Sequence, residues 1–137
     1  MTIRNRRRAL RAAVVTAATA SAFGLAAATA WAKADSSFTA GPHTVRLGAT
    51  VHLAGQGDDD NSTYNRFCVQ ERFGAGHWVT LRCSHGGYNA GGSVDMRIRP
   101  SHRGQWQFRG VLTEASSPRD RHQTIIQATR TVTVHVR

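Results

Sequence analysis

The sequence predicts an all-β fold, an antiparallel sandwich of about seven short strands that follows an N-terminal export signal. Three observations predict it. Apolar and polar residues alternate with a period of two in several runs after residue 42. Turn signals rich in glycine or proline separate these runs, at a spacing of about 8–15 residues. No run keeps the 3.6-residue apolar period of a helix over ten residues.

The first 34 residues have the organisation of an export signal. Five arginines lie between residues 4 and 11 before any acid, and residues 12–32 carry no charge. Small residues stand three and one positions before two candidate cleavage points, after Ala32 and after Ala34. A secretory signal peptide over residues 1–34 is therefore predicted. A retained membrane anchor is the alternative, and the arginine run fits either the general secretory (Sec) or the twin-arginine export route.

Removal of this signal changes the charge of the chain. The sequence has 18 Lys and Arg against 8 Asp and Glu, and six of the basic residues lie in the signal. Twelve arginines and eight acids remain, a formal charge of +4. This charge fits nonspecific attraction to anionic envelope polymers and singles out no nucleic acid. We predict a secreted protein, extracellular or attached to the cell envelope, outside the membrane after cleavage.

The mature chain is expected to begin with a lead-in followed by one domain. Residues 35–42 are polar and are predicted to form a flexible lead-in, and residues 43–137 to form the β-domain. Alternation then predicts strands around Val45 and Leu47 and around Val51 and Leu53. The glycine- and acid-rich run that follows Leu53 is predicted to be a loop.

Two cysteines frame the next element, a hairpin. If Ala75-Gly76 is a two-residue turn, Cys68 and Cys83 stand opposite each other on adjacent strands, within disulfide reach. A bulge or a longer turn would shift this register by one residue. An even cysteine count in an exported chain indicates a disulfide. Because neither CxxC spacing nor a nearby Cys/His quartet occurs, we predict a structural disulfide between Cys68 and Cys83.

The second half of the domain is predicted from alternation and turn residues. Residues 94–98 form the clearest half-buried strand, and a turn at residues 100–104 leads into the next strand. A loop over residues 113–123 precedes a single last strand over residues 124–136. The side chains predicted to point inward are Val94, Met96, Ile98, Trp106, Phe108, Val132, Val134 and Val136.

Three short motifs resemble bacterial immunoglobulin-like domains. Residues 48–55 (GATVHLAG) resemble their A′/B region, residues 103–108 (RGQWQF) their F strand, and the closing Val-x-Val-x-Val their G strand. Over about residues 43–137 the chain is similar to small secreted actinobacterial proteins with such a sandwich. The resemblance implies an immunoglobulin-like β-sandwich. The local cysteine pair departs from the inter-sheet bridge of that family, so a barrel is the alternative.

Recognition is expected in the loops 55–65, 84–93 and 113–123, because loops on a rigid sandwich commonly carry binding. The acidic run of the first loop offers oxygen ligands suited to calcium. The EF-hand register fails, since Thr63 and Val69 stand where glycine and glutamate are required. No metal site is predicted, and weak calcium binding by a different loop geometry is the alternative. The candidate binding residues are Asp58, Asp59, Asp60, His85, Tyr88, Arg119 and Arg121.

Signatures of catalysis are missing from the sequence. No GxSxG motif occurs, and the seven histidines show neither helical i, i+4 nor HxH spacing. Convergence of His77 with His85, or of Glu71 with Asp95, is the weaker alternative. The sequence therefore predicts a protein that is not an enzyme and needs no cofactor.

A basic face is the remaining candidate site. Four arginines lie on or beside two strands expected to be neighbours, with Trp106 between them. Because Trp106 shares its parity with Phe108, it is predicted to be core, and the arginines to form a solvated face without a specific nucleic-acid ligand. These arginines are Arg97, Arg99, Arg103 and Arg109.

The function predicted from these features is that of an extracellular or cell-envelope binding module without catalysis. Its partner is expected to be an anionic envelope polymer or an extracellular protein. The alternative is a small secreted inhibitor or ligand carrier that uses the 113–123 loop or a cleft between the sheets.

Overall fold

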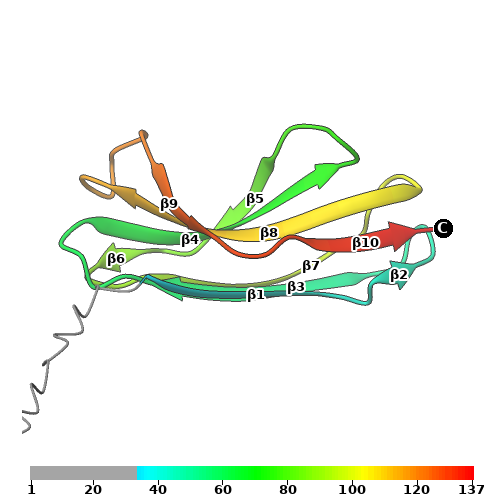
Figure 1. Ribbon diagram of the computed structural model, residues 1–137, viewed down its shortest axis with the longest axis horizontal. Coiled ribbons are helices and arrows are strands. Elements are labelled where there is room, and N and C mark those ends of the chain that lie inside the picture. The colour runs from blue at the N-terminus through cyan, green and yellow to red at the C-terminus, as the bar shows by residue number, and fades with distance from the viewer. Residues whose placement is uncertain (1–33) are drawn as a thin grey trace, which may run out of the picture.

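The computed structural model describes residues 34–137, in which ten strands form two facing sheets (Figure 1). The first sheet has the order β1 (Asp35–Gly41), β3 (Val51–Asp58), β7 (Gly92–Ile98). The second has the order β2 (Thr44–Val45), β10 (Val132–Val136), β8 (Gly104–Ala115), β4 (Tyr64–Phe73), β5 (Val79–Cys83). Two short strands complete it: β6 (Gly87–Tyr88) pairs with β4, and β9 (Thr124–Ala128) pairs with β8.

The all-β prediction is confirmed, because this part of the chain contains strands and turns and no helix. Accordingly, no segment of residues 34–137 is a helix of the length and apolarity needed to cross a membrane. The predicted signal peptide lies outside the described residues, except for Ala34.

Residues 35–42, predicted to be a flexible lead-in, instead contain a sandwich strand. β1 pairs with β3 over seven residues, from Asp35 opposite Asp58 to Gly41 opposite His52. Ala40 is buried in the core, and Phe38 packs against it. The composition concealed this alternation, because the polar Ser36 shares the inward side with Phe38 and Ala40. The sandwich therefore includes residues 35–41.

The last predicted strand, residues 124–136, is in fact two strands that share one edge of β8. The first half of β8 pairs with β10, with Trp106 opposite Val134, and the second half pairs with β9, with Val111 opposite Ala128. Between them the Thr129 amide donates to the Gly110 carbonyl at 2.9 Å. A strand of twelve residues thus accommodates two short partners in succession.

The predicted disulfide is confirmed, and Cys68 lies directly opposite Cys83. The predicted two-residue turn is wrong. Val69 pairs with Arg82 but Gln70 pairs with Thr80, so one residue of β5 bulges out of the ladder. The connection is correspondingly longer and runs over residues 74–78.

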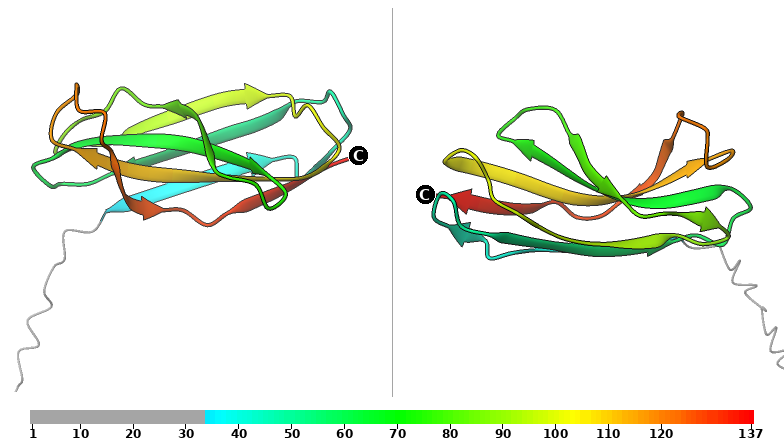
Figure 2. Two further views of the ribbon diagram at one scale, coloured as in Figure 1. Left: turned by 90° about the horizontal axis from the view of Figure 1, so that it is seen from above. Right: turned by 180° about the vertical axis from the view of Figure 1, so that it is seen from behind.

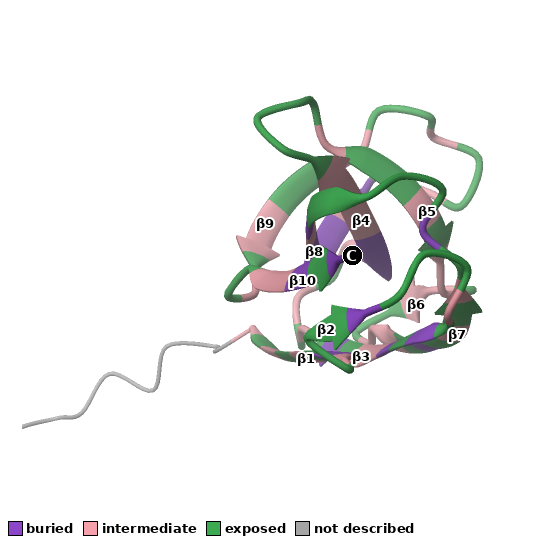
Figure 3. Cartoon of the chain, turned by 90° about the vertical axis from the view of Figure 1, so that its right-hand side faces the viewer, coloured by how far each residue is buried: buried purple, intermediate pink, exposed green. Residues whose placement is uncertain are grey.

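The core fills the space between the sheets (Figure 3). Phe67 at its centre is fully buried, and its ring lies against the backbone of Gly55, Gly57 and Gly110. A Cβ built on Gly110 would lie 2.3 Å from the Phe67 Cζ atom, closer than any real contact. Glycine at residue 110 is therefore required by the close approach of the ring. The predicted inward position of Trp106 is confirmed, since it is 8% exposed.

Two segments rise from the second sheet on the side away from the first sheet. They are the β4–β5 hairpin and the β8–β9 connection (Figures 1 and 2). Between them, outward-pointing residues of β4 and β8, namely Cys68, Val111 and Thr113, are buried. The connections β3–β4, β5–β7 and β8–β9 leave the opposite end of the sandwich from the C-terminus (Figure 1).

Candidate functional site

The predicted loops 55–65, 84–93 and 113–123 were too long, because strands continue into them: β3 runs to Asp58, β4 begins at Tyr64, β7 begins at Gly92 and β8 ends at Ala115. The remaining connections meet at one end of the sandwich, and we call residues 59–63, 84–91 and 116–123 the loop end. Hydrogen bonds tie these segments to one another through β4. The Tyr64 hydroxyl donates to the carbonyl of His85, and the Arg66 Nη2 donates to the carbonyl of Pro118 at 3.1 Å. The loops therefore form one continuous surface on the strand that all three border.

A buried amide orders the acidic part of the loop end. Asn65 has no exposed surface, and its Nδ2 donates to the Asn61 Oδ1 at 2.8 Å. The Asn61 Nδ2 in turn donates to the Asp59 Oδ2 at 2.9 Å and to the Glu114 Oε2 at 3.3 Å. These oxygens thus have protein donors as partners. Residues 34–137 hold no group of three His, Cys, Asp or Glu side chains arranged to bind a metal.

A second carboxylate fixes the turn that carries two of the candidate arginines. Asp120 accepts hydrogen bonds from the Ser116 hydroxyl at 2.7 Å, the Ser116 amide at 3.3 Å and the His122 amide at 2.9 Å. These bonds, that of the Ser116 hydroxyl above all, lower the pKa of Asp120 from 3.8 to about 2. The flanking arginines, Arg119 and Arg121, are both exposed.

The structure brings all seven candidate binding residues to this end of the molecule. Tyr88 is 52% exposed and packs edge-on against Tyr64, with ring centroids 5.4 Å apart. Asp58 is the last residue of β3, and Asp60 is exposed beside it. The remaining members are Asp59, His85, Arg119 and Arg121.

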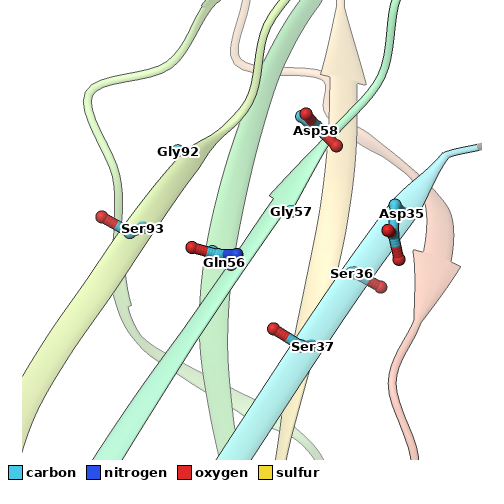
Figure 4. Close-up of a pocket in the computed structure, with 8 residues that line it drawn as sticks. All are labelled: Asp35, Ser36, Ser37, Gln56, Gly57, Asp58, Gly92 and Ser93. Carbon is cyan, nitrogen blue, oxygen red and sulfur yellow. The ribbon is translucent and has the colours of Figure 1, made fainter.

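A polar cavity of about 610 Å³ opens on the first sheet at the same end (Figure 4). It lies over the β1–β3–β7 ladder, where Ser37 stands opposite Gln56 and Gln56 opposite Ser93. Asp35 and Asp58 also stand opposite each other there, an unfavourable placement of like charges. The cavity offers hydroxyl, amide and carboxylate groups to a polar ligand. Sequence reasoning missed it because β1 was not predicted.

The pairs of residues considered for catalysis do not come together. His77 lies in the β4–β5 connection and His85 beyond the far end of β5. Glu71 stands opposite Phe108 on the inward side of β4, and burial raises its pKa. Asp95 is on the first sheet, with its Oδ1 2.9 Å from the His52 Nε2.

The predicted basic face of four arginines is wrong. β7 and β8, which were expected to be neighbours, belong to different sheets, so Arg97 and Arg109 lie on different layers. Arg109 instead stands diagonally across from Arg72 on the outer face of the second sheet, beside Trp78.

No known protein family matches the sequence, and no curated protein sequence matches it. The solved structures that are similar over 75% of the chain include the following three. The CARDB domain of the PF1109 protein from Pyrococcus furiosus is 10% identical, with a TM-score of 0.43 and 88% of its length covered. A β-glucosidase from Listeria innocua is 9% identical, with a TM-score of 0.41. The β-glucosidase EmGH1 from Erythrobacter marinus is 8% identical, with a TM-score of 0.43. The chain spans 16% and 15% of those two enzymes.

Proposed function

We propose that the chain is an exported immunoglobulin-like β-domain that binds a partner through its loop end and has no catalytic activity. The strand order supports the immunoglobulin-like type. Two sheets of order β1-β3-β7 and β2-β10-β8-β4-β5 face each other, and the short β2 pairs in parallel with the last strand β10. The disulfide joins the neighbouring strands β4 and β5, unlike the inter-sheet bridge of antibody domains.

Export is supported by the signal-like residues 1–34 and by the disulfide, since disulfides persist in oxidising compartments. The full chain is to be expressed in a secreting bacterium and the extracellular form analysed by N-terminal sequencing and intact mass. We expect an oxidised protein that begins at Lys33 or Asp35. A chain found only in the membrane fraction with Met1 in place contradicts export.

The observation that carries the binding role is the locked loop end. Tyr64 and Arg66 hydrogen-bond to backbone carbonyls of two of its segments, so the backbone that carries the exposed side chains is held in place before a partner arrives. Tyrosine and arginine are the residue types that dominate binding energy at protein interfaces. Tyr88, Arg119 and Arg121 supply them here, all exposed. The proposed partner is an extracellular protein or a component of the cell envelope.

The alternative of a secreted inhibitor uses part of the same surface, the loop over residues 113–123. A captured partner that is an enzyme blocked by the exported protein would identify that role. The ligand-carrier alternative requires a cleft between the two sheets. Phe67, Phe108 and Leu53 are fully buried in that space, and the cavity of Figure 4 lies on the outside of the first sheet.

Affinity capture tests the loop end. The exported protein is immobilised and exposed to culture fluid and envelope extract of the producing organism at physiological salt. The variant Tyr88→Ser/Arg119→Ser/Arg121→Ser should lose the captured species. The matched variant Leu47→Ser/Arg46→Ser/Arg103→Ser removes one apolar side chain and two arginines outside the loop end and should keep it. Equal capture by both variants, or capture only of anionic polymer that moderate salt removes, refutes the proposal.

A further inference from the structure

A cluster of cationic and aromatic side chains on the outer face of the second sheet is independent of the loop end. The Arg72 guanidinium lies 4.6 Å from the centre of the Trp78 ring, and the Arg109 guanidinium 4.2 Å from the same ring. Arg72 comes from β4, Arg109 from β8 and Trp78 from the connection before β5. We call these three residues the arginine platform. All three are half-buried.

Neutral side chains hold the platform in place. The Arg109 Nε donates to the Gln70 Oε1 at 2.9 Å, and the Arg72 Nε donates to the Gln107 Oε1. Each glutamine lies directly opposite its arginine in the β4–β8 ladder. Among residues 34–137, the terminal nitrogens of both guanidiniums have no hydrogen-bond partner. A hydrogen bond from Nε therefore orients each guanidinium, and its two terminal nitrogens, Nη1 and Nη2, are free to donate to a ligand.

No carboxylate of residues 34–137 forms an ion pair with these arginines. By the ladder register, the outward side chains of β4 and β8 include no Asp or Glu in the described chain. The ion pairs of that same part of the chain, His52–Asp95 and His122–Asp120, involve no arginine. Both guanidiniums lie against the same half-buried Trp78 ring, and burial together with the nearby Arg72 charge lowers the pKa of Arg109. Such an arrangement costs stability, and an anionic ligand would offset that cost.

The geometry favours phosphate over carboxylate as the anion. A carboxylate is planar and pairs edge to edge with one guanidinium. Two guanidiniums held on different strands are better bridged by a tetrahedral group with several acceptor oxygens. The site ends at this pair, because the next outward residues along the ladder, Cys68 and Val111, are buried. Arg66 lies beyond them and donates instead to the Pro118 carbonyl.

We propose that the arginine platform binds phosphate groups of a linear phosphate polymer. The polymer would lie across the platform on the outer face of the second sheet, where Arg72, Arg109 and Trp78 are half-buried. Its phosphate oxygens accept hydrogen bonds from the free guanidinium nitrogens of Arg72 and Arg109. The proposal goes beyond the proposed function, because the platform shares no residue with the loop end or with the side chains that hold it.

Calorimetric titration of the exported protein with inorganic polyphosphate tests this site, with Trp78 emission as a local reporter. The variant Arg72→Gln/Arg109→Gln should bind about tenfold more weakly or worse at low salt, and its slope of log affinity against log salt should be smaller by about 1.4. The matched variant Arg97→Gln/Arg99→Gln removes two charges at β7 of the other sheet and should stay within about twofold of wild type. Circular dichroism establishes that each variant is folded.

Three further arms decide the chemistry. The variant Arg72→Lys/Arg109→Lys keeps the charge but loses the planar fork, and its affinity should fall between wild type and the glutamine variant. Binding of this variant at wild-type strength overturns the guanidinium assignment. Poly-glutamate of matched charge should bind more weakly than polyphosphate, and equal affinity overturns the phosphate assignment. Tighter binding of single-stranded DNA than of polyphosphate overturns a base-free polymer as the occupant.

Discussion

The close approach of Gly110 to Phe67 makes a quantitative prediction about the core. A Cβ at residue 110 would lie 2.3 Å from the Phe67 Cζ and 2.8 Å from its Cε2, while ordinary contact begins at 3.4 Å. The ring or the strand must therefore move by about 1.1 Å in Gly110→Ala. The ring cannot swing into solvent because Phe67 is fully buried. Overpacking of this kind costs about 2–3 kcal/mol, which lowers the Tm by roughly 10–20 °C.

A double-mutant cycle isolates the contact. Phe67→Leu removes the crowding ring carbons and by itself costs about 1–2 kcal/mol through the space it leaves. In Gly110→Ala/Phe67→Leu the new methyl group fills part of that space. The double variant should therefore be more stable than the sum of the single effects by about 1–3 kcal/mol.

Denaturant unfolding of the oxidised, exported protein measures all three variants. Gly41→Ala is the matched control, because a Cβ there has no atom within 4 Å. Its stability should differ from wild type by no more than about 1 kcal/mol, the effect of the substitution on the unfolded chain. Single effects that add within about 0.5 kcal/mol would refute the packing of Phe67 against Gly110.

Three other predictions concern the disulfide and two carboxylates. Cys68→Ala/Cys83→Ala opens a 15-residue loop and should lower the free energy of unfolding by about 3 kcal/mol in denaturant titration; an unchanged midpoint would contradict a stabilising role. Burial raises the folded-state pKa of Glu71, so stability is lost as pH rises through that value, and Glu71→Gln should be the more stable protein at about pH 7 and equal at about pH 3. Hydrogen bonding lowers the pKa of Asp120 from 3.8 to about 2 in the folded protein. The stability that the ionised carboxylate contributes is therefore fully present above the unfolded-state pKa and is lost as pH falls through about 2. An NMR titration of the Asp120 carboxyl should give a midpoint near this pKa in the wild type and a higher midpoint in Ser116→Ala. Identical midpoints in the two proteins would contradict the hydrogen bond from Ser116.

Local alternation predicted the parts of the fold whose inward residues are strongly apolar. The inward positions of β7 and β10 are valine, methionine and isoleucine, so their parity is visible in the sequence. The cysteine pairing followed from hairpin register, although the bulge after Val69 shifts the remaining pairs. β1 was missed because its one large inward residue, Phe38, stands among serine, threonine and alanine.

The arginine platform could not be predicted because it depends on which strands become neighbours. Arg72 and Arg109 are 37 positions apart, and only the β4–β8 ladder places them diagonally across from each other. The sequence suggested instead that β7 and β8 pair, since they are consecutive. The chain crosses from the first sheet to the second between β7 and β8. Which strands become neighbours depends on how the whole core packs.

Loop positions were predicted more successfully than their internal structure. Glycine, proline and aspartate marked the three connections, and the sandwich brings them to one end. The locking contacts of Tyr64 and Arg66 come from a strand that borders all three loops. Such contacts join residues distant in sequence and leave no local pattern.

Site-specific photo-crosslinking in secreting cells tests the binding role of the loop end most directly. A photoreactive residue is placed at Tyr88 of the exported full chain, and in a second strain at Leu47, which lies outside the loop end and is similarly exposed, at 44% against 52%. Binding through the loop end predicts a discrete crosslinked species from residue 88 and none from residue 47. Crosslinks of equal yield from both positions, or from residue 47 alone, would contradict it.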